Sequence, residues 1–329
     1  METKPLVTFI IPVYNLPVTM LSQCIESIRS LSLGQSEREI IVVDDGSPVP
    51  LTSCPSPLTP ENGLPWIDEI VYVRQRNGGV STARNRALAL ASGSFIQFVD
   101  GDDMLIQAPY EHVLDLLRYE HADLVMFSHT DSTEAILTYD DQGPMTGSDL
   151  MRKHNIHGAV WGMVFSKHIL GQQRFTPGVA YGEDEEFTPQ LLLRAEHVFQ
   201  TTAKAYFYRQ HDAQATSGGS TRQAIRRLND TLGVLCRLNR AAATMPAADR
   251  LALQRRTAQL TMDYIYNVMV MTGSRHYLKR KLETLRREGL YPLPDRNYTK
   301  KYSWFRKMAN SETGLVILMR MLPLFKRER

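Results

Sequence analysis

The chain has 329 residues, enough for one large α/β domain with a smaller appendage or for two modest domains. Hydrophobic residues make up 43% and charged residues 22%, which is typical of a folded globular protein and excludes extensive disorder. The net charge of +3 is unevenly spread: residues 296–329 carry nine Lys/Arg and two Glu, so this segment is +7 and the preceding 295 residues are −4. Because residues 1–295 carry no excess of basic side chains, a nucleic-acid-binding face is disfavoured, and we expect no nucleic-acid partner.

Cysteine usage and hydropathy indicate the compartment. Cys24, Cys54 and Cys236 are odd in number and widely spaced, which disfavours a disulfide framework or a zinc site. Cys24 falls on the apolar face of an expected helix, where we predict a buried thiol. The apolar run near the N-terminus is too short to span a membrane and lacks a small-residue cleavage site, and no other segment is long enough to span one. We therefore expect a cytoplasmic protein.

The first 130 residues alternate between predicted strands and helices. Residues 6–13 form a β-branched run typical of a strand buried on both faces of a parallel sheet. A helix at 18–31 and a buried strand at 39–43 follow, and this order implies a right-handed parallel crossover. The six prolines of residues 48–65 predict an irregular surface loop. Next in order we predict a strand at 69–74, a helix at 80–92, a strand at 95–99, a helix at 109–120 and a strand at 122–128.

Beyond residue 130 the predicted elements are shorter and mixed, and the chain then becomes helical. The sequence shows no internal repeat. Residues 222–289 are mostly helical in pattern, and 298–329 mix aromatic, apolar and basic residues. Between residue 130 and the helical region, we predict helices at 147–154 and 184–195 and strands at 160–165 and 204–209.

Acidic clusters follow two of the first four predicted strands. Asp44-Asp45 ends one strand, Asp100-Gly101-Asp102-Asp103 ends another, and Glu183-Asp184-Glu185-Glu186 comes later. Ligands of open parallel sheets bind beyond the carboxyl ends of the strands. Clustered carboxylates repel one another, and hard cations such as Mg²⁺ or Mn²⁺, often bound with substrate phosphates, offset that repulsion. A nucleoside diphosphate fits this requirement, although Asp-Gly and Asp-Asp pairs also occur in ordinary turns.

Five motifs occur in a fixed order. They are Ile11-Pro12-Val13-Tyr14-Asn15, Val43-Asp44-Asp45-Gly46-Ser47, Asn77-Gly78-Gly79-Val80-Ser81-Thr82-Ala83-Arg84-Asn85, Gly93, and Asp100-Gly101-Asp102-Asp103. The ordered set resembles the family 2 glycosyltransferases over roughly residues 5–210. The resemblance implies an α/β GT-A fold, with a Rossmann-like, mostly parallel central sheet flanked by helices. We expect a glycosyltransferase domain over 1–215, divided into a nucleotide-sugar-binding half (1–104) and an acceptor half (105–215), and a helical C-terminal region over 216–329.

The resemblance also implies which residues bind the donor. Pro12, Tyr14 and Asn15 match the end of the family's first strand, which contacts the nucleotide, with the Tyr14 ring near the base. Asp44 or Asp45 matches the acidic residue that hydrogen-bonds the base, usually uracil. The loop containing Asn77 and Gly78 matches the one that lies along the donor. Arg84 matches a position near the base and diphosphate; a salt bridge within the acidic site is an equal alternative.

Metal and base positions follow from the same resemblance. Asp100, Gly101 and Asp102 match the family's DxD motif, with Asp102 as metal ligand and Asp100 as its neighbour or a ribose contact, while the role of Asp103 stays open. His211 lies where some members supply a metal or diphosphate contact. The implied cofactor is Mn²⁺ or Mg²⁺. Glu183 and Asp184 match the family's ED motif, with Asp184 as general base, although acidic residues also favour a helix N-terminus.

The acceptor half is more divergent. Trp161 opens a segment that resembles the start of the family's acceptor region. The residue is expected to be either an apolar platform near the sugar or a core residue. We expect an inverting, metal-dependent transfer from a nucleotide-sugar, of the UDP-sugar class, to a hydroxyl of a glycan or lipid-linked sugar in polysaccharide or glycoconjugate biosynthesis.

Three alternatives to this function are weaker. A nucleotidyltransferase would carry a Gly-rich basic loop after the first strand, where this chain has Tyr14-Asn15-Leu16-Pro17. An NAD-dependent dehydrogenase would carry GxGxxG after a strand, which is absent. A non-catalytic sugar-binding relative fits poorly with the intact set of carboxylates.

The C-terminal tail is apolar and basic. Residues 313–325 are apolar except for Arg320, and Lys326-Arg327-Glu328-Arg329 follows. Such a segment lies on an anionic membrane surface or packs on the domain as a helix with a solvated basic end. The first alternative predicts peripheral contact with the inner face of the plasma membrane.

Overall fold

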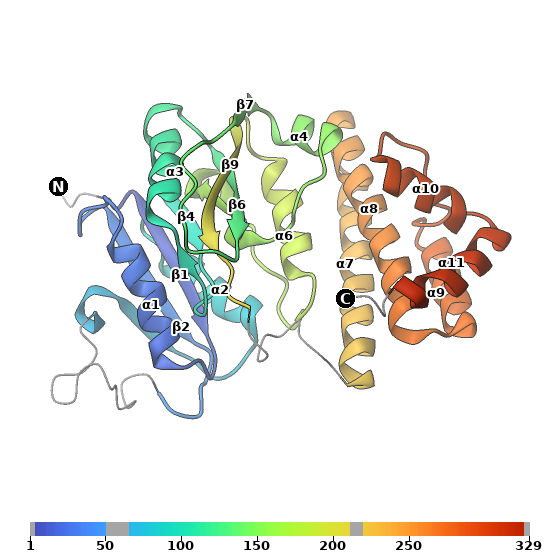
Figure 1. Ribbon diagram of the computed structural model, residues 1–329, viewed down its shortest axis with the longest axis horizontal. Helices are drawn as coiled ribbons and strands as arrows, with labels where there is room; N and C mark the ends of the chain where they lie inside the picture. The colour runs from blue at the N-terminus through green and yellow to red at the C-terminus, as the bar shows by residue number, and fades with distance from the viewer. Residues whose placement is uncertain (1–3, 51–65, 211–219, 326–329) are drawn as a thin grey trace. The chain divides into compact units, whose positions relative to one another are not determined.

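The computed structural model describes residues 4–50, 66–210 and 220–325 (Figure 1). The chain divides into two compact units. The first comprises residues 1–147 and 157–217, and the second comprises residues 148–156 and 218–329. The proline-rich loop predicted at 48–65 lies outside the described residues from position 51 onward, as do His211 and Lys326–Arg329.

The first unit is built on one mixed sheet. Its order in space is β3-β2-β1-β4-β8-β6-β9-β5, with β7 also paired to β9. Strands β1, β2, β3 and β4 are mutually parallel, and β6 is parallel to β9. Because β8 runs antiparallel to both β4 and β6, those two point the same way, and only β5, β7 and β8 oppose the rest. The sheet is therefore mostly parallel, which confirms the expected fold class.

The parallel half follows the sequence prediction closely. Strands β1 (Val7–Val13) and β2 (Arg38–Asp44) are almost entirely buried, as their continuous β-branched runs require. Helix α1 (Val18–Arg29) joins them, and helix α2 (Val80–Leu90) connects β3 (Val71–Arg74) to β4 (Phe95–Phe98). A short 3₁₀ helix (Ile67–Glu69) precedes β3. The predicted strands and helices of this half are confirmed within a few residues.

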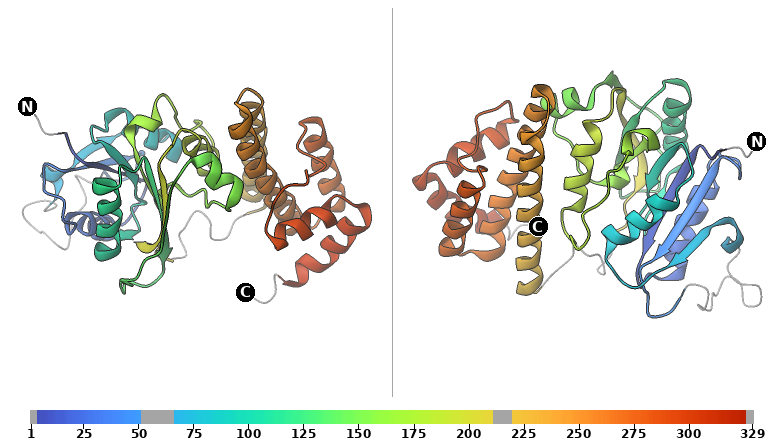
Figure 2. Two further views of the ribbon diagram at one scale, coloured as in Figure 1. Left: turned by 90° about the horizontal axis from the view of Figure 1, so that it is seen from above. Right: turned by 180° about the vertical axis from the view of Figure 1, so that it is seen from behind.

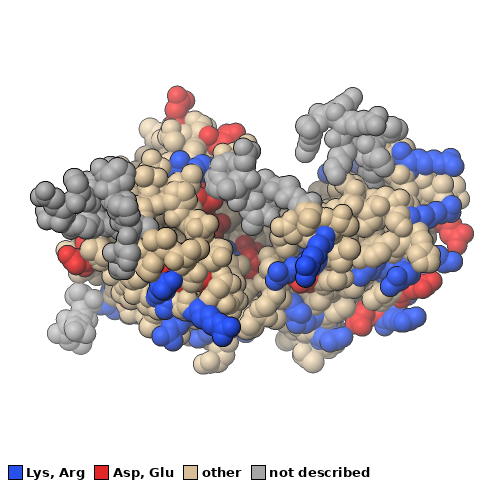
Figure 3. Space-filling model, turned by 90° about the horizontal axis from the view of Figure 1, so that it is seen from below, with Lys and Arg blue, Asp and Glu red and all other residues tan. Residues whose placement is uncertain are grey.

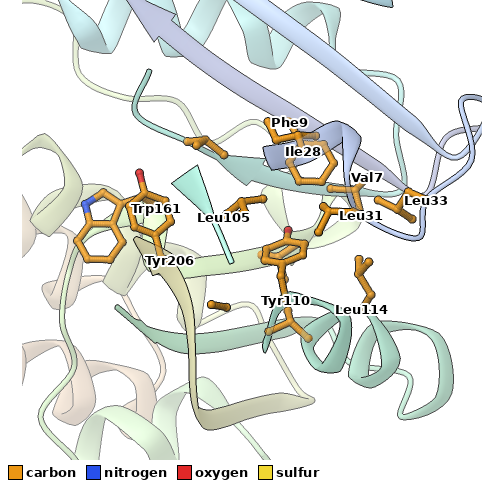
Figure 4. Packing of buried hydrophobic residues seen from close by; sticks show 14 of the residues in the cluster. Val7, Phe9, Ile28, Leu31, Leu33, Leu105, Tyr110, Leu114, Trp161 and Tyr206 are labelled. Atoms are coloured by element: carbon orange, nitrogen blue, oxygen red, sulfur yellow. The ribbon is translucent and has the colours of Figure 1, made fainter. Parts of the chain in front are cut away.

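Two sets of helices cover the two faces of the sheet. Helix α1 and helix α3 (Gln107–Tyr119) share one apolar cluster with strand residues such as Val7 and Phe9. Figure 4 shows Ile28, Tyr110 and Leu114 from these helices in one apolar cluster with Phe9. On the opposite face lie α2 and α6 (Glu183–Leu192), seen from behind in Figure 2. There Phe98, Phe165, Phe175 and Phe187 form a second aromatic core.

The remaining half of the sheet departs more from the prediction. Strand β6 (Leu124–Thr130) and strand β8 (Met163–Ser166) lie near their expected positions, the latter after a 3₁₀ turn (Val160–Gly162) and before α5 (Lys167–Leu170). Strand β9 (Val198–Phe207) is longer than predicted. Strands β5 (Met104–Leu105) and β7 (Asp141–Met145) were not predicted, because two residues give no periodicity and β7 is an exposed polar edge strand.

The second unit consists of helices. They are α4 (Gly147–Lys153), α7 (Thr221–Ala243), α8 (Ala247–Thr272), α9 (Arg275–Arg287), α10 (Lys300–Ala309) and α11 (Glu312–Phe325). The helical character expected for this region is confirmed. The sequence predicts a single boundary at residue 215. In the structure the second unit also includes residues 148–156, which come earlier in the chain.

A buried arginine holds that short segment in the helical unit. Arg255 on α8 donates to the carbonyl oxygens of Met151 and His154 at 2.7 and 2.8 Å and to Asn155 Oδ1 at 3.2 Å. Its Nε donates to the carbonyl oxygen of Asn297 at 2.7 Å. Arg255 thereby supplies hydrogen-bond donors to buried backbone carbonyls, which are costly to leave unpaired.

Candidate active site

The candidate site begins where three parallel strands end at the same edge of the sheet. Strands β2, β1 and β4 are neighbours in the sheet and run in the same direction. Their carboxyl ends therefore bring Asp44-Asp45, Tyr14-Asn15 and the Asp100–Asp103 turn to one edge (Figure 1). This is the edge at which open parallel sheets bind ligands.

The Asp100–Asp103 turn is held from two directions. The backbone N–H of Asp100 donates to the hydroxyl of Tyr206 at 3.0 Å. Arg209 donates from its backbone N–H to Asp103 Oδ1 at 2.8 Å and from Nε to the carbonyl oxygen of Asp102 at 2.7 Å. At Gly101, a Cβ would lie 2.7 Å from Leu16 Cδ2 and 3.0 Å from Val13 Cγ1, so any larger residue would require these side chains to shift. The turn is therefore a rigid element.

The three aspartates of this turn have different surroundings. Asp103 is buried, and burial raises its pKa to about 7, partly offset by the hydrogen bond from Arg209. The Asp100 side chain is 33% exposed; burial raises its pKa, the Arg84 guanidinium lowers it, and Asp102 raises it further. Asp103 thus serves the internal structure of the turn, while Asp100 and Asp102 offer partly accessible carboxylates.

Arg84 joins this turn to the second acidic cluster. It lies on α2, its side chain is only 4% exposed, and its Nη1 is 2.6 Å from Asp184 Oδ1 and 3.0 Å from Glu183 Oε1. Its Nη2 is 3.4 Å from Asp100 Oδ1. The guanidinium also lies over the Phe98 and Phe175 rings, at 5.7 and 5.3 Å from their centroids.

The ion pairs of Arg84 keep its cation stable despite burial. Burial alone would lower the pKa of Arg84, but the charges of Asp184, Asp100 and Glu183 more than compensate and raise it. Of the two interpretations for Arg84, the structure shows the salt bridge within the acidic site. A contact between Arg84 and a diphosphate stays a prediction.

Glu183 and Asp184 form the first turn of α6. Asp184 Oδ2 accepts from the backbone N–H of Val160 at 3.4 Å, and the Asp184 side chain remains 21% exposed. Burial raises the pKa of both carboxyls, with Arg84 opposing this shift and the pair's mutual repulsion adding to it at Asp184. A partly accessible carboxyl with a raised pKa is suited to exchange a proton near neutral pH.

Asp44 and Asp45 are engaged within the protein. Asp44 is fully buried and accepts from the Ser47 backbone N–H at 2.8 Å and from the Tyr72 hydroxyl at 2.9 Å. Asp45 is 4% exposed and accepts from the backbone N–H groups of Gly78 and Gly79 at 2.9 and 2.7 Å. These contacts fix the loop that contains Asn77 and Gly78. A hydrogen bond from either carboxylate to the nucleotide base stays a prediction. Of the two side chains, Asp45 is the one with some exposed surface for it.

The end of β1 presents an aromatic ring. Tyr14 is 56% exposed, as a surface for stacking requires. Asn15 adopts a left-handed conformation with φ 49°, and its backbone N–H donates to Ser47 Oγ at 2.9 Å. Pro12 is half-buried within the strand. This segment and the Asp44–Ser47 turn therefore support one another.

Comparisons with known proteins identify the family that part of the chain matches. Residues 8–168 match the family model described as glycosyl transferase family 2. This segment belongs to that family. Over 106 residues, 32% of this chain, it is 37% identical to the minor teichoic acid biosynthesis protein GgaB of Bacillus subtilis (strain 168), of which it covers 11%. The chain spans between 11% and 64% of the length of the curated relatives it matches.

Solved structures share the fold. A crystal structure of S. aureus TarS 1-349 superimposes with a TM-score of 0.59 at 15% identity, covering 98% of this chain and 91% of that one. The same TarS fragment has been crystallised with UDP-GlcNAc and with UDP. The mannosyltransferase PcManGT from Pyrobaculum calidifontis, in complex with GDP-Man and Mn²⁺, matches with a TM-score of 0.52 at 15% identity, covering 99% and 88% of the two chains.

The family resemblance implies a bound divalent cation, and the described residues show whether such an ion could be held. Within residues 4–50, 66–210 and 220–325, no three His, Cys, Asp or Glu side chains are grouped as a protein-only metal site would need. Mg²⁺ and Mn²⁺ sites in nucleotide enzymes, however, use one or two carboxylates and take further oxygens from phosphates. Asp100 and Asp102 provide hard oxygen donors, and the pKa of Asp100 is raised mainly by burial and further by the charge of Asp102. These two carboxylates therefore suit a hard cation whose remaining ligands are phosphate oxygens.

Sequence reasoning missed an aromatic cluster beside Asp184. Trp161 is 9% exposed and stacks on Tyr206 with ring centroids 4.6 Å apart, so it is a core residue. It also makes an edge-on contact with His129 and a tilted contact with Tyr208. His157 approaches it at 5.9 Å. The alternation of buried and exposed residues along β9 could have placed Tyr206 inside, but only the fold could bring it under Asp100.

Proposed function

We propose that this family 2 member is an inverting glycosyltransferase that moves a sugar from a UDP-sugar to a hydroxyl acceptor. The observation that carries the proposal is the set of ion pairs by which Arg84 joins Asp100, in the donor turn, to Asp184, at the start of α6. This arrangement places a partly accessible carboxylate beside the turn expected to hold the diphosphate. The family match and the UDP-GlcNAc complex of the TarS fragment support the donor class.

In the proposed mechanism Asp184 acts as general base. The acceptor hydroxyl has a high pKa, so its proton must be removed as the oxygen attacks the anomeric carbon. Asp184 takes that proton, while Arg84 and the backbone N–H of Val160 hold its carboxylate in place. Direct displacement needs one catalytic carboxylate and inverts the anomeric centre, unlike the two-carboxylate hydrolysis of glycosides.

On the donor side, Asp102 and Asp100 would hold Mn²⁺ or Mg²⁺ together with the donor's phosphates. When bound, such a cation neutralises charge on the leaving diphosphate. Tyr14 stacks on the base, and Pro12, Asn15 and the loop at Asn77 and Gly78 border the nucleoside. Metal dependence is part of this proposal, to which the Mn²⁺ and GDP-Man complex of PcManGT lends support.

The acceptor is proposed to be a glycan or lipid-linked sugar of a surface polysaccharide or glycoconjugate. The accessible rings of Tyr208 and His129 pack on the buried Trp161, which follows Val160, whose N–H binds Asp184. Aromatic rings provide apolar faces on which sugar rings pack. The description of GgaB as a teichoic acid biosynthesis protein supports a cell-surface polymer.

We place the reaction in the cytoplasm, at the inner face of the plasma membrane. Cys24 and Cys236 are free thiols, as expected in a reducing compartment. Among the described residues, none of the helices has the length and apolarity needed to span a membrane. Membrane contact would therefore be peripheral within this part of the chain.

The experiment that tests the function is a donor-turnover assay. The full chain would be incubated with a panel of UDP-sugars and Mn²⁺, with and without candidate glycan acceptors, and released UDP would be measured. We expect UDP release from at least one donor, and its loss in Asp184→Asn. Absence of UDP release with every donor, or pyrophosphate release from a nucleoside triphosphate, would favour a non-catalytic relative or a nucleotidyltransferase instead.

A further inference from the structure

Helix α10 carries a basic stripe around an exposed tryptophan. Lys300, Lys301, Trp304 and Lys307 are all exposed, and at helical spacing they lie on one side of the helix. Phe305 and Ala309 are buried on the other side, where the neighbouring Tyr302 hydroxyl donates to Asp263 of α8 at 2.9 Å. The stripe is therefore the outward face of a helix already anchored in its unit.

The exposed tryptophan is unusual for this chain. Trp304 is 50% exposed, whereas Trp66 and Trp161 are 1% and 9% exposed. An exposed tryptophan flanked by lysines at helical spacing gives the helix a surface that is both apolar and cationic, which is the composition of helices that lie in a membrane interface. Tryptophan favours the membrane interface, where one part of its ring is apolar and another is wet.

Helix α11 adds a second, more apolar surface that also contains a cation. Ile317 and Met321 are 40% and 38% exposed, with the exposed Arg320 between them. Helices α10 and α11 are separated by two residues and pack against each other. Within the described residues, α10 contains no acidic side chain and α11 contains only Glu312. Figure 3 shows Lys and Arg side chains spread over the visible surface of the helical unit.

We propose that the α10–α11 surface, defined by Lys300, Lys301, Trp304, Lys307, Ile317, Arg320 and Met321, binds an anionic lipid bilayer. The lysine stems would lie along the interface with their ammonium groups on the headgroups, while Trp304 and the α11 apolar residues enter the acyl boundary. The occupant is a lipid surface because apolar and cationic groups are interleaved, and because the nearby exposed Asp295 is paired with Arg306 at 2.9 Å, which leaves Glu312 as the acidic residue within the two helices. This places the binding determinant on folded helices, with α10 contributing most of its charge.

Helix α9 provides a matched control. It carries Lys279, Arg280 and Arg287 in exposed positions but no exposed large apolar side chain. If attraction to anionic lipid were purely electrostatic, removing three charges from α9 or from α10 would weaken it equally. The proposed surface depends on α10, because only there do exposed lysines flank an exposed tryptophan.

The test combines vesicle binding with tryptophan emission. The full chain would be mixed with vesicles of phosphatidylcholine alone or with phosphatidylglycerol, and sedimented. We expect binding only to the anionic vesicles, with a blue shift in emission that Trp304→Phe removes, since the other two tryptophans are already buried. Lys300→Gln/Lys301→Gln/Lys307→Gln should weaken binding on the order of 100-fold, from roughly fivefold per lysine near the surface.

The α9 triple variant Lys279→Gln/Arg280→Gln/Arg287→Gln should bind within a few-fold of the original chain. Equal weakening by both triple variants would overturn the proposal in favour of nonspecific charge attraction. Failure to bind anionic vesicles would overturn it outright. An emission shift that grows with protein concentration without lipid would mean that a second copy covers Trp304, and would also overturn it. Unchanged UDP release and circular dichroism would show that each variant is folded.

Discussion

Replacing Arg84 by glutamine should alter the pH dependence of catalysis. The guanidinium lies 2.6 Å from Asp184 and lowers the pKa of that carboxyl against the larger effect of burial. An opposite charge at this distance shifts a carboxyl pKa by about 1–3 units. Because the base must be ionised, the acid limb of the kcat/KM profile in Arg84→Gln should move upward by about one pH unit or more.

The same substitution should destabilise the fold. Removing one partner of a buried ion pair costs about 3–5 kcal/mol. The three carboxylates around Arg84 are 12–33% exposed, so hydration reduces the expected cost to about 2–3 kcal/mol. This corresponds to a fall in Tm of about 5–10 °C for a domain of this size.

The destabilisation should itself depend on pH. Burial raises the folded pKa of Glu183 and Asp184 above unfolded values near 4, so stability falls as pH rises from about 4 through the raised folded pKa values. Without Arg84 the carboxylates are harder to ionise, and the Tm difference from the original chain should widen from pH 4 to pH 8.

Arg86 supplies the control for both measurements. It lies on the same helix, is exposed, and loses the same charge in Arg86→Gln. Kinetic profiles and thermal melts of this variant should match those of the original chain. The reasoning fails if Arg84→Gln is folded and its acid limb coincides with that of Arg86→Gln.

Three further substitutions test separate parts of the site. Asp184→Asn should leave UDP affinity, measured by calorimetry, nearly unchanged and lower transfer by a factor on the order of 10²–10⁴; full activity would remove Asp184 as the base. Asp102→Ala should abolish the gain in UDP affinity on adding Mn²⁺, and an undiminished gain would contradict a metal site there. Gly101→Ala should lower stability by about 1–3 kcal/mol, because its Cβ would lie 2.7 Å from Leu16 Cδ2; an unchanged melting temperature would show that Leu16 moves aside without cost.

Much of the parallel half of the sheet was predictable because its signals are local. Strands β1 and β2 are continuous apolar runs, and the helix between them has apolar residues at helical spacing. Strand β7 carries no such signal, since its sequence DQGPM is polar, contains Gly and Pro, and lies at an exposed edge. Its pairing with β9 depends on the fold around it.

The sequence predicted which residues form the site but not which of them contact one another. The carboxylates at 100, 102, 183 and 184 were expected from motifs, and the structure brings Asp100 and Asp184 to the same guanidinium. Nothing local to the sequence indicated that Tyr206 would accept from the Asp100 N–H, since 106 residues separate them. The partners of Asp45 were equally hidden, because Gly78 and Gly79 donate through their backbone, which has no residue-type signature.

The hydrogen bonds of Arg255 have a practical consequence for anyone who isolates the catalytic fragment. A fragment ending near residue 215 would keep the carbonyls of Met151 and His154 and the side chain of Asn155 but lose the guanidinium that binds them. The segment 148–156 would be left with unpaired polar groups and bare apolar residues such as Leu150 and Met151. Such a fragment should aggregate, whereas the full chain carries its own partner for this segment.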